Sequence, residues 1–163
     1  MIPFVFHPAT RPKHDNMTAY RDILPVVLAC LLKKDTRTSL ATAIEVIDIR
    51  SEEEIAAFGG IPGSINIPCS RPSGSEFRRI KAVLEHLEAP AVIYCHSGRR
   101  SATLCAALSA DGYVGVYDLA GGLSAWLGAD LPVEGGGLIT DLLRGRPKED
   151  AAPAVSQRMS LTA

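Results

Sequence analysis

Apolar positions along this chain form two patterns, short unbroken runs and amphipathic stretches, and the two patterns alternate. Runs rich in β-branched residues predict strands over 43–49, 64–67, 91–94 and 115–119. Between and around them, helical signals cover 23–34, 51–58, 73–89, 101–112 and 123–127. Strands that alternate with helices in this way predict an α/β fold with a central, mostly parallel β-sheet of about five strands and helices on both faces.

Local signals refine two of the predicted helices. Ser51 stands three residues before Glu54, and Ser73 stands three residues before Glu76, which is capping-box spacing at a helix start. The helix predicted over 23–34 tolerates a proline in its first turn. It is apolar on most sides, so its cysteine, Cys30, is predicted to lie in the core.

The segment 91–101, which reads AVIYCHSGRRS, combines a buried strand with unusual polar chemistry. The strand ends at Cys95, a short loop follows, and a helix is predicted to start at Ser101. Loop amides, the helix dipole and two arginines favour an anion there, and no acidic residue occurs between Ala89 and Asp111. Because such surroundings favour an exposed thiolate, Cys95 is the predicted nucleophile, cradled by backbone N–H groups of 96–101.

Other residues are expected at the same edge of the sheet, because ligands of parallel sheets bind at the carboxyl ends of the strands. Asp48 and Arg50 end the strand 43–49 and are predicted to support the site, Arg50 as a structural ion-pair partner. Arg99 is expected to attract an anionic donor or a partner protein. Arg100 is expected to close the loop by pairing with an acid such as Asp48.

Composition and charge limit the classes of function that the chain can have. With 163 residues, 47% hydrophobic and 21% charged, the chain predicts one soluble domain over 19–133, an N-terminal arm over 1–18 and a mobile tail over 134–163. The net charge of −1 argues against nucleic acid or an anionic membrane as partner. Four cysteines without CxxC pairs or metal-ligand spacing predict neither a disulfide framework nor a metal site, but a reducing compartment, the cytoplasm. No apolar stretch reaches the roughly 20 residues of a membrane span.

Four motifs in order over 42–133 resemble the rhodanese family in its single-domain form: VIDIR, GGIPGSINIP, YCHSGRRSA and AGGLSAWLGADLPV. The resemblance implies a rhodanese-like fold and a sulfurtransferase without metal or organic cofactor. Cys95 would take sulfane sulfur from a donor such as thiosulfate, as a persulfide, and pass it to cyanide or to a thiol, including that of an acceptor protein. The implied substrate-binding residues are those of the loop: His96, Ser97, Gly98, Arg99, Arg100 and Ser101. Two departures are Gly60, where the family often has His, and His96, where Arg is common.

Two other function classes stay open. One is a cysteine-dependent phosphatase or arsenate reductase on a related fold, which would use the same arrangement of a thiolate, backbone N–H groups and an arginine. The cysteine phosphatases space Cys and Arg by five residues, whereas only four separate Cys95 from Arg100, and this smaller cup favours sulfur over phosphate. A non-catalytic rhodanese-like binding module is the third reading, and the complete loop argues against it.

Several side chains have a structural interpretation beside a functional one. His96 is either a polar loop residue or a general base, and Cys69 is either an inert loop cysteine or a resolving thiol for Cys95. Cys105 and Trp126 are predicted to be packing residues. The cations on and before the helix 73–89 form either a solvated face or a docking surface for an acidic partner: Arg71, Arg78, Arg79 and Lys81.

Overall fold

The computed structural model describes residues 20–33, 44–87 and 89–136, so the predicted arm 1–18 and most of the predicted tail lie outside the described residues. None of the helices in this described part combines the length and the hydrophobicity that crossing a membrane requires. The elements follow one another as β1 (Arg21–Ile23), α1 (Pro25–Leu32), β2 (Glu45–Asp48), α2 (Glu52–Phe58), β3 (Ile65–Asn66), α3 (Gly74–His86), β4 (Ala91–Tyr94), α4 (Arg99–Ala110), β5 (Val116–Leu119) and α5 (Gly122–Gly128).

The five strands form one sheet in the order β1-β5-β4-β2-β3, and every neighbouring pair is parallel. This confirms the predicted α/β fold. β4 is the middle strand, with β2 on one side and β5 on the other. Cys95, the residue after β4, is therefore placed at the centre of the carboxyl edge, where ligands of parallel sheets bind.

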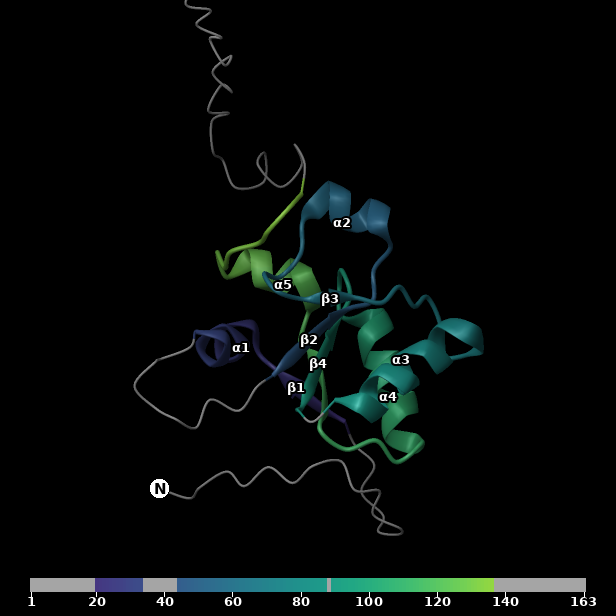
Figure 1. Cartoon of the computed structure of the whole chain (residues 1–163). Helices are drawn as coiled ribbons and strands as arrows, with labels where there is room; N and C mark the ends of the chain where they lie inside the picture. The colour runs from purple at the N-terminus through teal and green to yellow at the C-terminus, as the bar shows by residue number, and fades with distance from the viewer. Residues whose placement is uncertain (1–19, 34–43, 88, 137–163) are drawn as a thin grey trace, which may run out of the picture.

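Helices cover both faces of the sheet, as predicted. Figure 1 shows α1 and α5 on one side of the strands and α3 and α4 on the other. Each side has its own hydrophobic core, with Cys105 fully buried in the core under α4 and Trp126 in the core under α5. The Trp126 indole Nε1 donates a hydrogen bond to the Pro132 carbonyl at 2.7 Å, so both residues pack as predicted.

The first predicted helix is wrong at its start and in its buried face. Ile23 belongs to strand β1, which pairs with β5 at the edge of the sheet, and α1 begins at Pro25. A three-residue strand is too short to show a period in the sequence. Cys30 is exposed rather than buried, because α1 packs through Leu28 and Ala29. In a helix that is apolar on most sides, the pattern does not indicate which face meets the sheet.

The two predicted capping boxes have different outcomes. At α2, the Glu54 N–H donates to Ser51 Oγ at 3.3 Å and the Ser51 N–H donates to the Glu54 carboxylate at 3.2 Å, which confirms the first. At α3, Ser73 precedes the helix but makes no side-chain cap. The Glu76 carboxylate instead accepts the N–H and hydroxyl of Ser70, at 2.9 and 3.1 Å, so this acid holds the preceding loop.

Candidate active site

A left-handed glycine turns the chain from β4 into α4. Gly98 has a φ of +83° and caps the helix, which begins at Arg99, two residues before the predicted start at Ser101. The first helical hydrogen bond runs from the Ala102 N–H to the Gly98 carbonyl at 2.9 Å. Both arginines and Ser101 thus form the first turn, whose N–H groups have no acceptor within the helix and favour an anion.

Helix α5 forms hydrogen bonds with the loop that follows β4. The Leu123 N–H donates to the Cys95 carbonyl and the Ser124 N–H to the His96 carbonyl, both at 2.9 Å. The Ser124 hydroxyl also donates to the His96 carbonyl at 3.0 Å. These hydrogen bonds hold the loop against α5, a contact that the sequence did not suggest.

The Cys95 side chain lies under the loop rather than in the open. The residue is only 1% exposed, so the prediction that its sulfur is exposed is wrong. The Ser101 hydroxyl is 3.6 Å from the Cys95 sulfur and 3.1 Å from the Gly98 carbonyl. Ser101 was predicted to contribute its backbone N–H, and its side chain proves to be a second group next to the sulfur.

Arg100 closes the loop through a different acid from the one predicted. Its guanidinium forms a two-pronged pair with the Glu54 carboxylate, at 2.5 and 3.0 Å, and not with Asp48. The hydrogen bond from Arg100 lowers the pKa of Glu54, and Glu54 in turn raises the pKa of Arg100, with a smaller contribution from the nearby Cys95 sulfur. Glu54 was not predicted as a site residue, although an acid in the first turn of a helix at the carboxyl edge was the available signal.

Asp48 and Arg50 form a buried pair beneath the site, which confirms the structural role predicted for Arg50. They are 1% and 0% exposed. Arg50 donates to the Asp48 carboxylate from its backbone N–H at 2.9 Å, from Nε at 3.0 Å and from Nη2 at 2.6 Å. Burial lowers the pKa of Arg50, but the hydrogen bond and charge of Asp48 raise it further, so the net pKa lies above the ordinary value.

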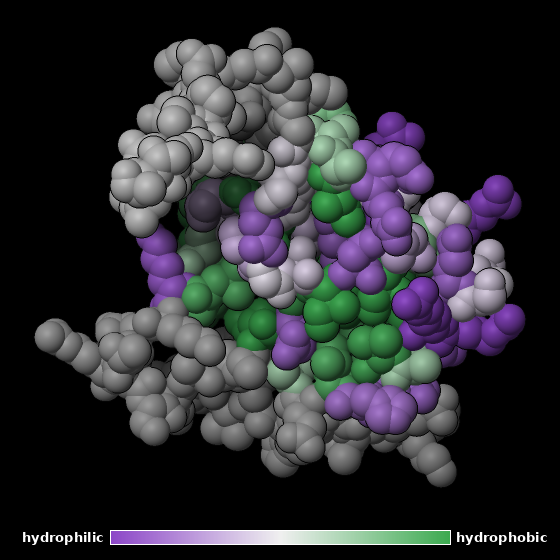
Figure 2. Space-filling model, turned by 45° about the horizontal axis from the view of Figure 1, so that its top comes forward, coloured by the Kyte–Doolittle hydropathy of each residue, from purple (hydrophilic) through white to green (hydrophobic). Residues whose placement is uncertain are grey.

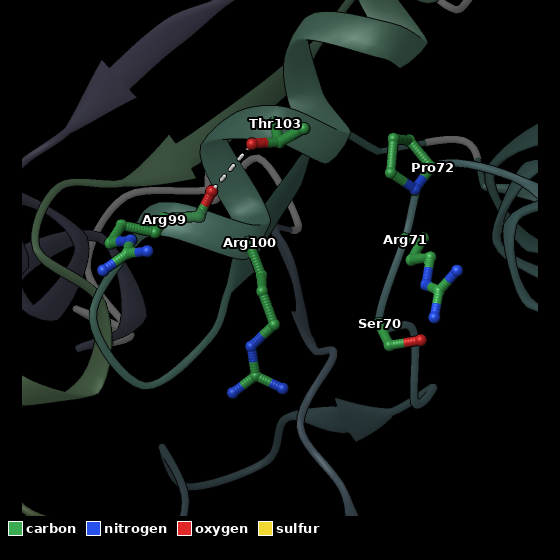
Figure 3. A pocket seen from close by; sticks show the side chains of 6 residues that line it. All are labelled: Ser70, Arg71, Pro72, Arg99, Arg100 and Thr103. Atoms are coloured by element: carbon green, nitrogen blue, oxygen red, sulfur yellow. Dashed lines mark hydrogen bonds between the residues drawn. The ribbon is translucent and has the colours of Figure 1, made fainter.

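A cavity of about 370 Å³ opens beside the first turn of α4 and is lined by Ser70, Arg71, Pro72, Arg99, Arg100 and Thr103. In Figure 3 it lies between the start of α4 and the segment 70–72, while the Arg71 side chain points away from α4. Figure 2 shows hydrophilic side chains gathered on the side where α3 lies in Figure 1. Of the four predicted cations, only Arg71 lines the cavity, and Lys81 pairs with Asp111 at 2.8 Å.

Neither His96 nor Cys69 has surroundings that favour a catalytic role. The half-buried His96 ring packs on Phe58 with centroids 4.7 Å apart, and its Nδ1 has no hydrogen-bond partner among residues 20–33, 44–87 and 89–136. Cys69 is buried and donates from Sγ to the Arg71 carbonyl at 3.0 Å. Burial raises the pKa of the Cys69 thiol, which disfavours the thiolate that a resolving cysteine needs. Within the same ranges, no group of His, Cys, Asp and Glu is placed to hold a metal ion.

Comparison with known proteins places this geometry in a family. A model of the "Rhodanese-like domain" family matches residues 31–129. The chain is 36% identical to a "Sulfurtransferase" of Allochromatium vinosum over 88 residues, which is 54% of this chain and 76% of that protein. It is 31% identical to "Thiosulfate sulfurtransferase 16, chloroplastic" of Arabidopsis thaliana over 94 residues, 54% of this chain and 78% of the relative.

Solved structures agree with this placement. A rhodanese-related protein from Thermoplasma volcanium superposes with a TM-score of 0.55 and 32% identity over 70% of this chain and 97% of its own. The As-Sb reductase of Leishmania major superposes with a TM-score of 0.50 and 29% identity, over 68% of this chain and 79% of its own. The family match covers more than half of the sequence, and the fold agrees with it, so the chain belongs to the rhodanese-like domain family.

Proposed function

We propose that the protein is a sulfurtransferase that carries sulfane sulfur on Cys95. The observation that carries the proposal is the position of this cysteine, buried at the centre of the carboxyl edge, with the Ser101 hydroxyl 3.6 Å from its sulfur and Arg100 nearby. Such a site stabilises a thiolate and, one atom further out, a persulfide anion. The names of the Allochromatium and Arabidopsis relatives support this reaction class.

The proposed reaction has two steps, with thiosulfate as the example of a donor and cyanide as the example of an acceptor. The Cys95 thiolate attacks the outer sulfur of thiosulfate, a new S–S bond forms a persulfide on Cys95, and sulfite leaves with the electron pair of the broken S–S bond. The acceptor then attacks the outer sulfur of the persulfide and leaves as thiocyanate, which regenerates the thiolate. A thiol acceptor, small or on a protein, would receive the same sulfur atom and become a persulfide.

The proposed donor is an anion, and the cations beside the loop fit that charge. Arg99 is exposed on the first turn of α4, and Arg71 borders the same cavity from the segment 70–72, with its side chain pointing away from α4. We expect Arg99→Gln to raise the KM for thiosulfate about threefold at low ionic strength and to leave kcat unchanged, because a surface charge acts mainly on encounter. Steady-state kinetics at two salt concentrations check this.

Arg21→Gln is the matched control for that experiment, because Arg21 is an exposed cation that begins β1, at the amino end of the sheet. It should leave the KM for thiosulfate unchanged. An equal rise in both variants would mean that net charge alone matters and that Arg99 has no local role.

Intact-protein mass spectrometry before and after thiosulfate tests the proposed function directly. The wild-type protein should gain about 32 Da, one sulfur, and lose it again on addition of cyanide. Cys95→Ser should show no gain. If neither thiosulfate nor a small-molecule persulfide adds sulfur to wild-type protein, the sulfurtransferase proposal is wrong.

A second candidate is arsenate or phosphate ester chemistry at the same cysteine. The similarity to the Leishmania As-Sb reductase favours it, and the short spacing from Cys95 to Arg100 opposes it. Arsenate reduction or phosphate ester hydrolysis that depends on Cys95, in protein that takes up no sulfur, would support this candidate.

The proposed compartment is the cytoplasm. All four cysteines of the chain are free thiols, and one of them, Cys30, is exposed. A reducing compartment keeps such thiols unpaired, which is what a persulfide carrier needs between turnovers.

A further inference from the structure

A buried carboxyl group lies one side chain away from the Cys95 sulfur. Asp118 is on β5, where its register partners are Ile93 on β4 and Asp22 on β1. It is only 4% exposed, and its Oδ1 has no hydrogen-bond partner among the residues that the structure describes. Buried carboxyl groups are uncommon unless they are paired, and each unsatisfied one asks for an explanation.

The side chain between this carboxyl and the sulfur is Ser101, which is fully buried on α4. Its hydroxyl lies 3.6 Å from the Cys95 sulfur. It is also near enough to Asp118 for a side-chain hydrogen bond to influence the acid: burial raises the pKa of Asp118, Ser101 lowers it, and the net value is about 6. The Gly98 carbonyl, 3.1 Å from the same hydroxyl, is a third acceptor. A hydroxyl has one proton to donate, so the carboxyl, the sulfur and this carbonyl compete for it.

The other titratable groups around Asp118 do not supply a counter-charge. Asp22 in β1 and Tyr20 just before it approach from one side, and Cys105 approaches from α4. Each of these three groups is either neutral or negative. Ser101 is therefore the neighbour best placed to respond when Asp118 gains or loses its proton.

We propose that Asp118 is a positioning residue for the sulfur chemistry of Cys95, because its carboxyl competes with the Cys95 sulfur for the single proton of the Ser101 hydroxyl. With Asp118 protonated, Ser101 donates to the thiolate or persulfide anion and stabilises it. With Asp118 ionised, Ser101 turns to the carboxylate, and the sulfur loses this donor. The inference rests on the proposed role of Cys95, and it is tested by a measurement that needs no sulfur donor.

The test is the pH dependence of Cys95 alkylation by iodoacetamide, followed by peptide mass spectrometry in a Cys30→Ser background that removes the exposed thiol. Asp118→Asn should raise the alkylation rate at pH 7 about fivefold and move the midpoint of the profile to lower pH, because the competing charge is gone. Asp118→Leu, which neither ionises nor accepts a hydrogen bond, should give at least the same increase. Asp111→Asn, which changes an exposed acid at the end of α4, should leave the alkylation profile unchanged.

A double-mutant cycle separates competition for the hydroxyl proton from simple charge repulsion. In a Ser101→Ala background the effect of Asp118→Asn should fall to less than half, because no proton is left to compete for. An undiminished effect there, or a change of less than twofold in the single variants, would overturn the proposal. Alkylation that behaves as expected in protein that takes up no sulfur would keep this coupling and overturn only the proposed function.

Thermal unfolding gives an independent readout of the same group. Since the folded-state pKa of Asp118 lies above its ordinary value of 3.8, folding disfavours the ionised form, and wild-type stability falls as the pH rises from about 4 through about 6. Asp118→Asn should therefore have a higher Tm than wild type at pH 7.5 and the same Tm at pH 4. A lower Tm at pH 7.5 would mean that Asp118 is ionised and paired in the fold, and the competition would then be excluded.

Discussion

Gly122→Ala is expected to abolish sulfur uptake and to destabilise the fold by about 2–4 kcal/mol. A Cβ at this position would lie 2.4 Å from the Cys95 carbonyl oxygen, 2.6 Å from the Gly98 nitrogen and 2.9 Å from the His96 carbonyl oxygen. All three atoms are backbone, so no side chain can rotate away. The loop and α5 must separate, which breaks the hydrogen bonds that hold the loop against α5 beside the Cys95 sulfur. Mass spectrometry with thiosulfate and thermal unfolding measure the two losses.

Gly63→Ala is the matched control for this prediction. Gly63 also has a left-handed backbone, with a φ of +76° against +58° at Gly122, but a Cβ there would meet nothing within 4 Å. It should lose about 1 kcal/mol from backbone strain alone and keep its sulfur uptake. Equal behaviour of the two variants would show that the contact between α5 and the loop does not matter.

Arg50→Met is expected to lower the free energy of unfolding by about 3–5 kcal/mol, because it leaves the Asp48 carboxylate buried without its partner. Asp48 is 1% exposed and receives three kinds of donor from Arg50, whose Nη2 also donates to the Gly59 carbonyl at 2.6 Å. The pair thereby joins the end of β2 to the end of α2. Urea unfolding monitored by circular dichroism measures the effect.

Two comparison variants identify the cause. The double variant Arg50→Met/Asp48→Asn should recover part of the loss, because no buried charge remains. Lys81→Met breaks an exposed pair, with side chains 32% and 44% exposed, and should lose no more than about 1 kcal/mol. A loss of less than 1 kcal/mol for Arg50→Met would show that water reaches Asp48 and that the pair is not a structural element.

The sequence alone predicted the parts of this protein that depend on near neighbours in the chain. The strands that became β2, β4 and β5 were found because each is a compact apolar run, and the start of α2 because Ser51 and Glu54 satisfy each other within one turn. Cys95 was found in the same way, since its loop, its arginines and the helix that follows are contiguous. The four motifs that led to the family lie in such local segments.

Only the tertiary structure decided which side chains meet across the sheet. β1 is a strand because β5 offers it hydrogen bonds, Arg100 pairs with Glu54 rather than Asp48, and Gly122 is required because α5 returns to the loop. Asp118 lies 17 residues beyond Ser101 in the chain, and only the packing of α4 on β5 brings them together. Each of these choices depends on distances through space between segments, and a period or a motif along one segment contains no information about them.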